Sequence, residues 1–149
     1  MRSYDSIKLK IQRAGTLALP WKDFDRAMIM INGHDFLQIA KKEEKKIFIE
    51  ENRPEDQAGV YHNMSLEELY GYLSNAENYK QKQNVPVLTC SCDETGCSRM
   101  SLTVCHTGYG VIWKDIHNIC GHYFDISYLF KLNDYEEFMA QLKKHAAIY

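Results

Sequence analysis

The sequence predicts an α+β fold, built as a single domain over residues 1–149. Three observations lead to this prediction. Alternating apolar and polar residues run through the C-terminal half, with connections too short for parallel crossovers, which predicts an antiparallel β-meander. The chain also opens with strand-like alternation. About three further segments repeat their apolar residues with the period of a helix.

Two strands are expected near the N-terminus. Within residues 4–13, Ile7, Leu9 and Ile11 alternate with lysine and glutamine, as in a strand with one buried face. Residues 27–31 form a short apolar run that ends at an Asn-Gly turn signal, which favours a buried strand.

Two helices follow in the N-terminal half. Over residues 34–46, Phe36 and Ala40 lie on one predicted helix face, and the mixed charges of residues 41–46 are interpreted as a solvated helix end with i,i+4 pairs. A polar linker is expected at residues 51–59. The next helix is expected to begin at Ser65, which forms a capping box with Glu68. Its apolar face comprises Leu66, Leu69, Tyr70 and Leu73.

The C-terminal half is expected to form four strands and a final helix. The predicted strands cover residues 86–92, 98–106, 111–117 and 122–130. Trp113 is expected to pack on the sheet face. Asn133 is predicted to cap the last helix, with Glu136 three residues on. Its inward-facing residues are Tyr135, Phe138, Met139 and Leu142.

Charge and hydropathy narrow the class of protein. The net charge is −2, so no strongly basic field draws in nucleic acid. No apolar run is long enough to span a membrane, and the N-terminus lacks the apolar core of a signal peptide. Five cysteines, an odd number, favour a reducing cytoplasm over a disulfide framework. We therefore expect a cytoplasmic protein that binds neither nucleic acid nor membrane.

Three cysteines within eight positions, Cys90, Cys92 and Cys97, mark the place where chemistry is expected. The reversal at DETG would bring Cys92 and Cys97 together. Their spacing lets two thiolates reach one zinc ion, whereas Cys90 fits less well because a regular strand holds it away from Cys92. The fourth ligand would come from His106, His117, Cys120 or His122.

Three other interpretations of these cysteines stay open. A disulfide would close across the turn between Cys97 and either Cys92 or Cys90, whereas a bond between Cys90 and Cys92 would be strained and easily reduced, as in a redox protein. The thiols would instead simply pack as small apolar groups, which is the favoured interpretation. The last alternative is a nucleophilic Cys97 activated by His106 or His117 and oriented by Asp115.

Four segments resemble a family of uncharacterised bacterial proteins. They are ING at 31–33, AGVY at 58–61, PVLTCSCDETGC at 86–97 and VIWKDIHN at 111–118. The family pattern has a C-x-C-x4-C turn followed by a V-x-W strand, and Phe124-Asp125 fits its last strand. The resemblance covers about residues 26–142. This chain has Asp93 where the family turn usually has glycine. The resemblance implies a fold and a bacterial cytoplasmic setting, and it implies no activity.

Ten tyrosines in a chain of this length suggest an amphipathic surface suited to binding. We therefore expect a non-enzymatic module that binds a protein partner or a second copy of itself. The alternative is a zinc-binding or thiol-redox protein centred on Cys90, Cys92 and Cys97. Zinc is the cofactor of the metal form of this alternative, and the favoured interpretation requires none.

Overall fold

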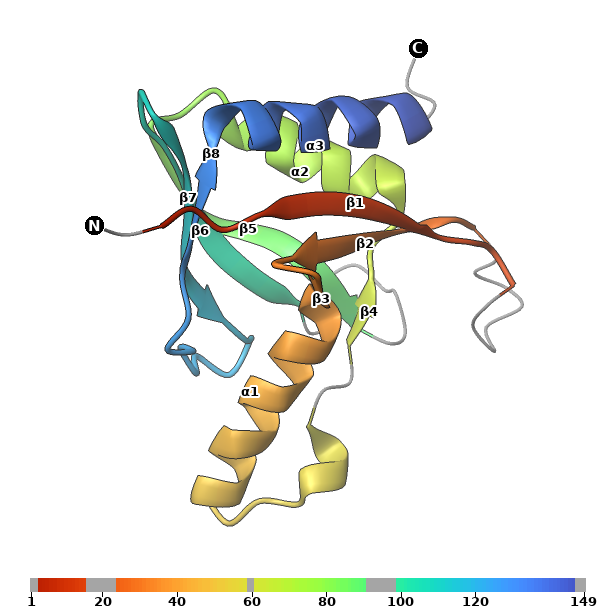
Figure 1. Cartoon of the computed structure of the whole chain (residues 1–149). Helices are drawn as coiled ribbons and strands as arrows, with labels where there is room; N and C mark the ends of the chain where they lie inside the picture. The colour runs from red at the N-terminus through yellow and green to blue at the C-terminus, as the bar shows by residue number, and fades with distance from the viewer. Residues whose placement is uncertain (1–2, 16–23, 59–60, 91–98, 147–149) are drawn as a thin grey trace.

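The computed structural model describes residues 3–15, 24–58, 61–90 and 99–146, which form two antiparallel sheets and three α-helices (Figure 1). The strands are β1 (Ile7–Gln12), β2 (Arg26–Ile31), β3 (His34–Asp35), β4 (Tyr61–Asn63), β5 (Gln81–Cys90), β6 (Met100–His106), β7 (Gly110–His117) and β8 (Tyr128–Lys131). The helices are α1 (Phe36–Glu50), α2 (Leu66–Ala76) and α3 (Leu132–His145), with a short 3-10 turn, η2, at Glu55–Gln57. The α+β class and the C-terminal meander are confirmed.

The smaller sheet has the order β1-β2-β3, and Ile7 lies opposite Ile31. Asn32 and Gly33 have φ angles of 53° and 81°, the left-handed values that a two-residue hairpin turn requires. The turn predicted at Asn-Gly is therefore confirmed. The Asn32 side chain also accepts a 2.8 Å hydrogen bond from the Ser6 N–H, which holds the start of β1 against the turn.

Both N-terminal helices begin at side-chain caps. The predicted capping box of α2 is confirmed, because Ser65 Oγ accepts from the Glu68 N–H at 3.2 Å. Asp35 caps α1 by accepting from the Leu37 N–H at 3.0 Å. Burial of its carboxyl raises the pKa of Asp35 above the ordinary value of 3.8, although this hydrogen bond works in the opposite direction.

Two predictions about the C-terminal end are wrong. The strand expected over residues 122–130 begins only at Tyr128, since the backbone pairs with β7 from that residue onward. Asn133 does not cap α3: the helix starts at Leu132, and Lys131 occupies the cap position without a side-chain hydrogen bond. Because β8 is extended up to Lys131, the chain turns from strand directly into helix. The predicted inward face of α3 is confirmed.

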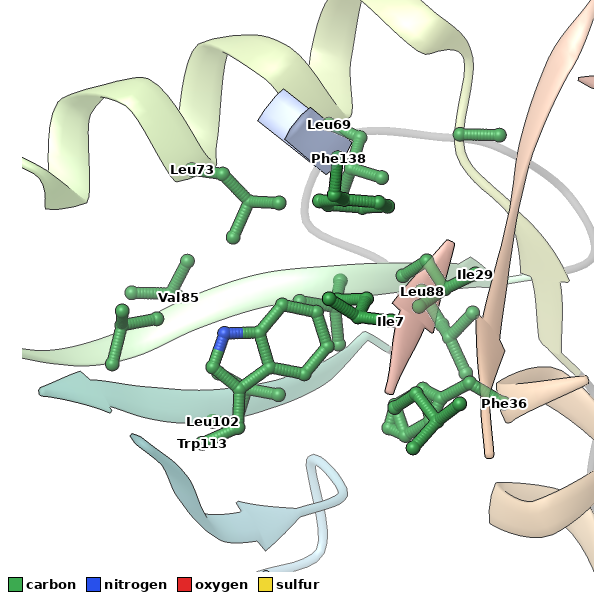
Figure 2. Packing of buried hydrophobic residues seen from close by; sticks show 14 of the residues in the cluster. Ile7, Ile29, Phe36, Leu69, Leu73, Val85, Leu88, Leu102, Trp113 and Phe138 are labelled. Atoms are coloured by element: carbon green, nitrogen blue, oxygen red, sulfur yellow. The ribbon is translucent and has the colours of Figure 1, made fainter. Parts of the chain in front are cut away.

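The core lies between one face of the larger sheet and the elements that cover it (Figure 2). Helices α2 and α3 lie side by side on this face, and the β1–β2 hairpin continues the same layer (Figure 1). Trp113 is fully buried, and its Nε1–H donates to the Tyr135 hydroxyl at 3.4 Å. The expectation that Trp113 packs on the sheet is thus confirmed. Figure 2 labels Val85, Leu88 and Leu102 from the sheet, Leu69 and Leu73 from α2, and Phe138 from α3.

Candidate functional site

A closed turn follows β7, at the end of the sheet where α1 packs. Gly121 N–H donates to the Asn118 carbonyl at 3.1 Å, and the His122 N–H donates to Asn118 Oδ1 at 2.9 Å. Gly121 has a φ of 85°. Asparagine at the first position and glycine at the fourth are the residues that such a β-turn prefers. The backbone of the turn is therefore fixed by Asn118 and Gly121, and Ile119 and Cys120 form its two corners.

A buried carboxylate anchors this turn to α1. Glu44 is 3% exposed, and its Oε2 accepts from Asn118 Nδ2 at 3.1 Å and from the Tyr61 hydroxyl at 2.8 Å. Asn118 is also 3% exposed. Since Tyr61 lies in β4, one carboxylate connects the helix, the edge strand and the turn. A buried carboxylate that accepts several hydrogen bonds is costly to disturb, so this connection holds the turn in one position.

His122 extends the same connection to the end of α1. Its Nδ1 lies 3.1 Å from Asn118 Nδ2, and its Nε2 lies 3.0 Å from Glu51 Oε2. The amide nitrogen of Asn118 is a donor, so His122 Nδ1 accepts a hydrogen bond from it. His122 Nε2 therefore carries the hydrogen and donates a hydrogen bond to Glu51 Oε2. The His122 ring also lies edge-on to Phe48, with 6.5 Å between ring centroids. The turn therefore contacts α1 at Glu44 and Phe48, and also contacts the C-cap residue of the helix, Glu51.

This fixed segment carries large apolar side chains on its outer side. Ile119 is 60% exposed and Tyr123 is 63% exposed. The Tyr123 ring lies against the His117 ring at 4.8 Å between centroids, which limits its movement. Ile49, 57% exposed, lies on the end of α1 that His122 contacts. We call Ile49, Ile119 and Tyr123 the turn surface.

Sequence reasoning missed Glu44, although a signal was present. The interpretation of residues 41–46 as a solvated helix end is wrong for Glu44, which is buried. The residue lies four positions after Ala40 and four before Phe48, and both of those are buried. Glu44 therefore occupies the apolar stripe of α1, where a carboxylate needs a buried partner. Lys46 and Glu43 do form an ion pair at 3.1 Å, although its spacing is i,i+3 rather than the expected i,i+4.

The cysteine turn falls largely outside the described residues. Cys92 and Cys97 are not among them, nor is the DETG reversal, and of Cys90 only the backbone is described. Cys90 ends β5 and pairs with Tyr61 of β4. The zinc, disulfide, packing and nucleophile interpretations of these cysteines stay predictions.

The structure separates the proposed fourth ligands into two groups. His117, Cys120 and His122 lie at the end of the sheet where β5 finishes. The pairing register places Pro86 of β5 opposite Ser101 of β6, and Ser101 opposite His117 of β7. Cys90 follows Pro86 by four residues, so it lies about 14 Å farther along β5 than the position aligned with His117.

His106 lies at the opposite end of β6, five residues or about 17 Å from Ser101. Its Nδ1 lies 3.2 Å from the Tyr79 carbonyl oxygen. His117 Nδ1 lies 2.7 Å from the backbone oxygen of Asp115, so this contact does not involve the Asp115 carboxylate proposed to orient it.

Within the described ranges, no group of three or more His, Cys, Asp or Glu residues is arranged to hold a metal ion. None of the described helices combines the length and the apolar character needed to cross a bilayer. Comparison with known proteins found no matching family model, no matching curated protein and no matching solved structure.

Proposed function

We propose that this chain is a cytoplasmic, non-enzymatic module that binds a protein partner through the turn surface. The observation that carries the proposal is Ile119 at the corner of the Asn118–Gly121 turn, 60% exposed. Turn corners favour small or polar residues, and the hydrogen bonds that close this turn involve Asn118, Gly121 and His122. A β-branched apolar side chain there contributes little to folding, which supports a role in binding.

Rigidity of the turn supports the same role. A binding segment that is already ordered loses less conformational entropy when its partner arrives. The turn is fixed by the hydrogen bond of Asn118 to Glu44 and by that of His122 to Glu51. The His117 ring packs against Tyr123 and restrains it. Exposed apolar side chains on an ordered support are typical of interface anchors, and tyrosine is enriched among them.

The test compares two sets of substitutions in exposed residues. Ile119→Asn combined with Tyr123→Ser removes two anchors of the turn surface. Tyr109→Ser is the matched control, because Tyr109 is 60% exposed but lies in the β6–β7 connection. Proteins captured by the wild-type chain from its source cells would be purified and their binary affinity measured.

We expect the double variant to weaken the binary affinity at least ten-fold, since hot-spot residues each contribute about 2 kcal/mol. The control should bind as the wild type does. Sedimentation of the same three proteins tests whether the partner is a second copy of the chain, in which case the double variant alone would be monomeric. Equal binding by all three proteins, or a wild type that is monomeric and captures no partner, would contradict the proposal.

A second candidate function is the zinc-binding or thiol-redox protein centred on Cys90, Cys92 and Cys97. One observation favours it: Cys90 of β5 lies opposite Tyr61 of β4 in the sheet, and the Tyr61 hydroxyl donates to Glu44. The cysteine segment thus begins beside a buried polar group. Protein purified without chelator should contain about one zinc per chain if the metal form is right. A zinc content near zero, with thiols that react slowly in the native protein, would argue against both forms.

A further inference from the structure

A concave site lies beside the open edge of β5, away from the residues of the turn surface. It is a cavity of about 370 Å³ between α2 and the segments at the start of β5 and β6. Its polar lining comprises Tyr72, Asn75, Lys82, Asn84 and Arg99, and Val85 contributes an apolar wall. We call it the Arg99 pocket. Its volume is within the range of small-ligand sites in proteins.

The charge of this pocket has one sign. Both ionisable groups of the lining that are charged at neutral pH, Lys82 and Arg99, are cations. Among the described residues, neither is in an ion pair with a carboxylate. The chain as a whole has a net charge of −2, so the pocket is a local positive site on a slightly acidic protein. Such a site attracts anions through its local positive charge, although the electrostatic field of the whole protein does not favour them.

Arg99 is held in position on one side of its guanidinium group. Its Nη1–H donates to the Tyr72 hydroxyl at 2.7 Å, and its Cζ lies 5.4 Å from the centre of the Tyr72 ring. The Tyr72 hydroxyl accepts this bond and keeps its own proton to donate. Arg99 Nε is buried, and no described residue accepts a hydrogen bond from it. Nε–H is therefore a buried donor that lacks an acceptor among the described residues.

The strand geometry adds the remaining polar groups. The pairing register of β5 with β6 shifts between Lys82 and Val85, and Asn84 has a φ of 56°. A bulge of this kind redirects side chains, which is why neighbouring positions of β5 line the same cavity. Lys82 is held over the Tyr79 ring, with its Nζ 4.8 Å from the ring centre. No described residue forms a hydrogen bond with the side-chain amide of Asn84.

We propose that the Arg99 pocket binds a small oxyanion, either a carboxylate or a phosphate group. The anion lies between Arg99 and Lys82 and accepts further hydrogen bonds from the Tyr72 hydroxyl and the Asn84 amide. Because Nε is covered in this structure, the guanidinium turns its Nε–Nη2 edge toward the cavity when the anion binds. That edge matches the two oxygens of a carboxylate or phosphate, and binding gives Nε its acceptor.

The experiment follows the Nε–H resonance of Arg99 by NMR during titration at constant ionic strength. Inorganic phosphate and acetate are titrated separately, so that the two chemical classes are distinguished. The Arg99 signal is assigned by its loss in Arg99→Gln. Arg13, which pairs with Asp25 on the exposed surface, provides the reference signal and the control variant Arg13→Gln.

We expect a saturable shift of the Arg99 Nε–H with at least one anion, at a dissociation constant on the order of a millimolar. A shift with phosphate alone, or with acetate alone, identifies the class. Lys82→Gln should weaken the binding about ten-fold, whereas Arg13→Gln should leave it unchanged. The proposal is overturned if neither anion gives saturation, if the Arg13 signal shifts in parallel, or if Lys82→Gln binds as the wild type does.

Discussion

Glu44 shows how one side chain joins segments that are distant in the chain. Its carboxylate accepts hydrogen bonds from Tyr61, 17 positions away, and from Asn118, 74 positions away. Both donors are buried. If the acceptor is removed, each donor loses its hydrogen bond without gaining water, which costs about 1–3 kcal/mol per group.

The first prediction concerns this carboxylate. Glu44→Ala should lower the free energy of unfolding by about 2–5 kcal/mol, because it removes both buried hydrogen bonds and leaves a cavity. Glu43→Ala, one residue away on the same helix, is the control and should change it by less than about 1 kcal/mol. Urea denaturation measures both values. Equal losses in the two variants would mean that Glu44 has no special role.

The second prediction concerns Asp35 and pH. Its folded-state pKa is raised above 3.8 by burial, so the folded state takes up a proton more readily than the unfolded chain does. This contribution to stability is complete below pH 3.8 and is lost as the pH rises through the folded-state pKa. Asparagine also caps helices but does not titrate. The wild type should therefore gain stability relative to Asp35→Asn as the pH is lowered from 7 toward 4.

Urea denaturation of the two proteins across that pH range provides the measurement. Asp35→Ala is the companion variant and should be about 1 kcal/mol less stable than Asp35→Asn at neutral pH, since alanine cannot cap the helix. A wild type that instead gains stability over Asp35→Asn as the pH rises would show that the pKa shift has the opposite sign.

At the scale of elements, the β7–β8 pairing depends on one glycine. A Cβ added to Gly110 would collide with the backbone oxygen of Phe130. Gly108, two residues earlier in the β6–β7 connection, has open space around it. β7 and β8 approach each other closely where Gly110 lies opposite Lys131, the last residue of β8. Because α3 begins at the next residue, this approach also positions the start of α3.

The third prediction compares these two glycines. Gly110→Ala should lower the free energy of unfolding by about 1–3 kcal/mol, because the strands must move apart to admit the methyl group. Gly108→Ala should change it by less than about 0.5 kcal/mol. Thermal and urea denaturation would both report the difference. If Gly110→Ala were tolerated as well as Gly108→Ala, the close approach of β7 to β8 would be wrong.

The elements that could be predicted from sequence are those with local causes. The Asn32-Gly33 turn and the Ser65 cap depend on residues within four positions of each other, so their signals are readable in one window. The cap predicted at Asn133 lies two residues after the observed cap, Lys131. The pairing of β8 with β7 extends up to Lys131, and that pairing cannot be read from the local pattern.

The candidate site could be predicted only in part for the same reason. Residue type alone identifies His117, Cys120 and His122 as candidates. His117 contacts Tyr123 of the turn surface, and His122 contacts Glu51 at the end of α1. The partnership of Glu44 with Asn118 depends on the tertiary fold. Period 3.6 places Glu44 on the buried stripe of α1, but nothing in the sequence identifies the partner from a distant loop.

At the scale of the whole molecule, the two sheets are joined by hydrogen bonds as well as by the shared core. Asp5 N–H donates to the Leu129 carbonyl at 2.7 Å, and the Leu129 N–H donates to Asp5 Oδ2 at 2.8 Å. Arg26 donates to the Asn63 carbonyl at 2.8 Å in a buried position. These contacts link the segment before β1 to β8, and β2 to β4, at the two opposite edges of the larger sheet.

The fourth prediction follows from this joining. The chain should unfold in a single cooperative transition, since neither sheet can lose its contacts without exposing the core of the other. Calorimetry provides the measurement: the calorimetric enthalpy should equal the van't Hoff enthalpy. Two resolved transitions, or a van't Hoff enthalpy well below the calorimetric value, would show that the sheets belong to separate units.

We propose that Ile119 serves binding at the turn and contributes little to folding. The most direct measurement is the free energy of unfolding of Ile119→Asn, obtained by urea denaturation beside the wild type. Asparagine suits a turn corner, so we predict a value unchanged within about 0.5 kcal/mol, or higher. A loss of more than about 1 kcal/mol would contradict the claim, because it would make Ile119 a packing residue.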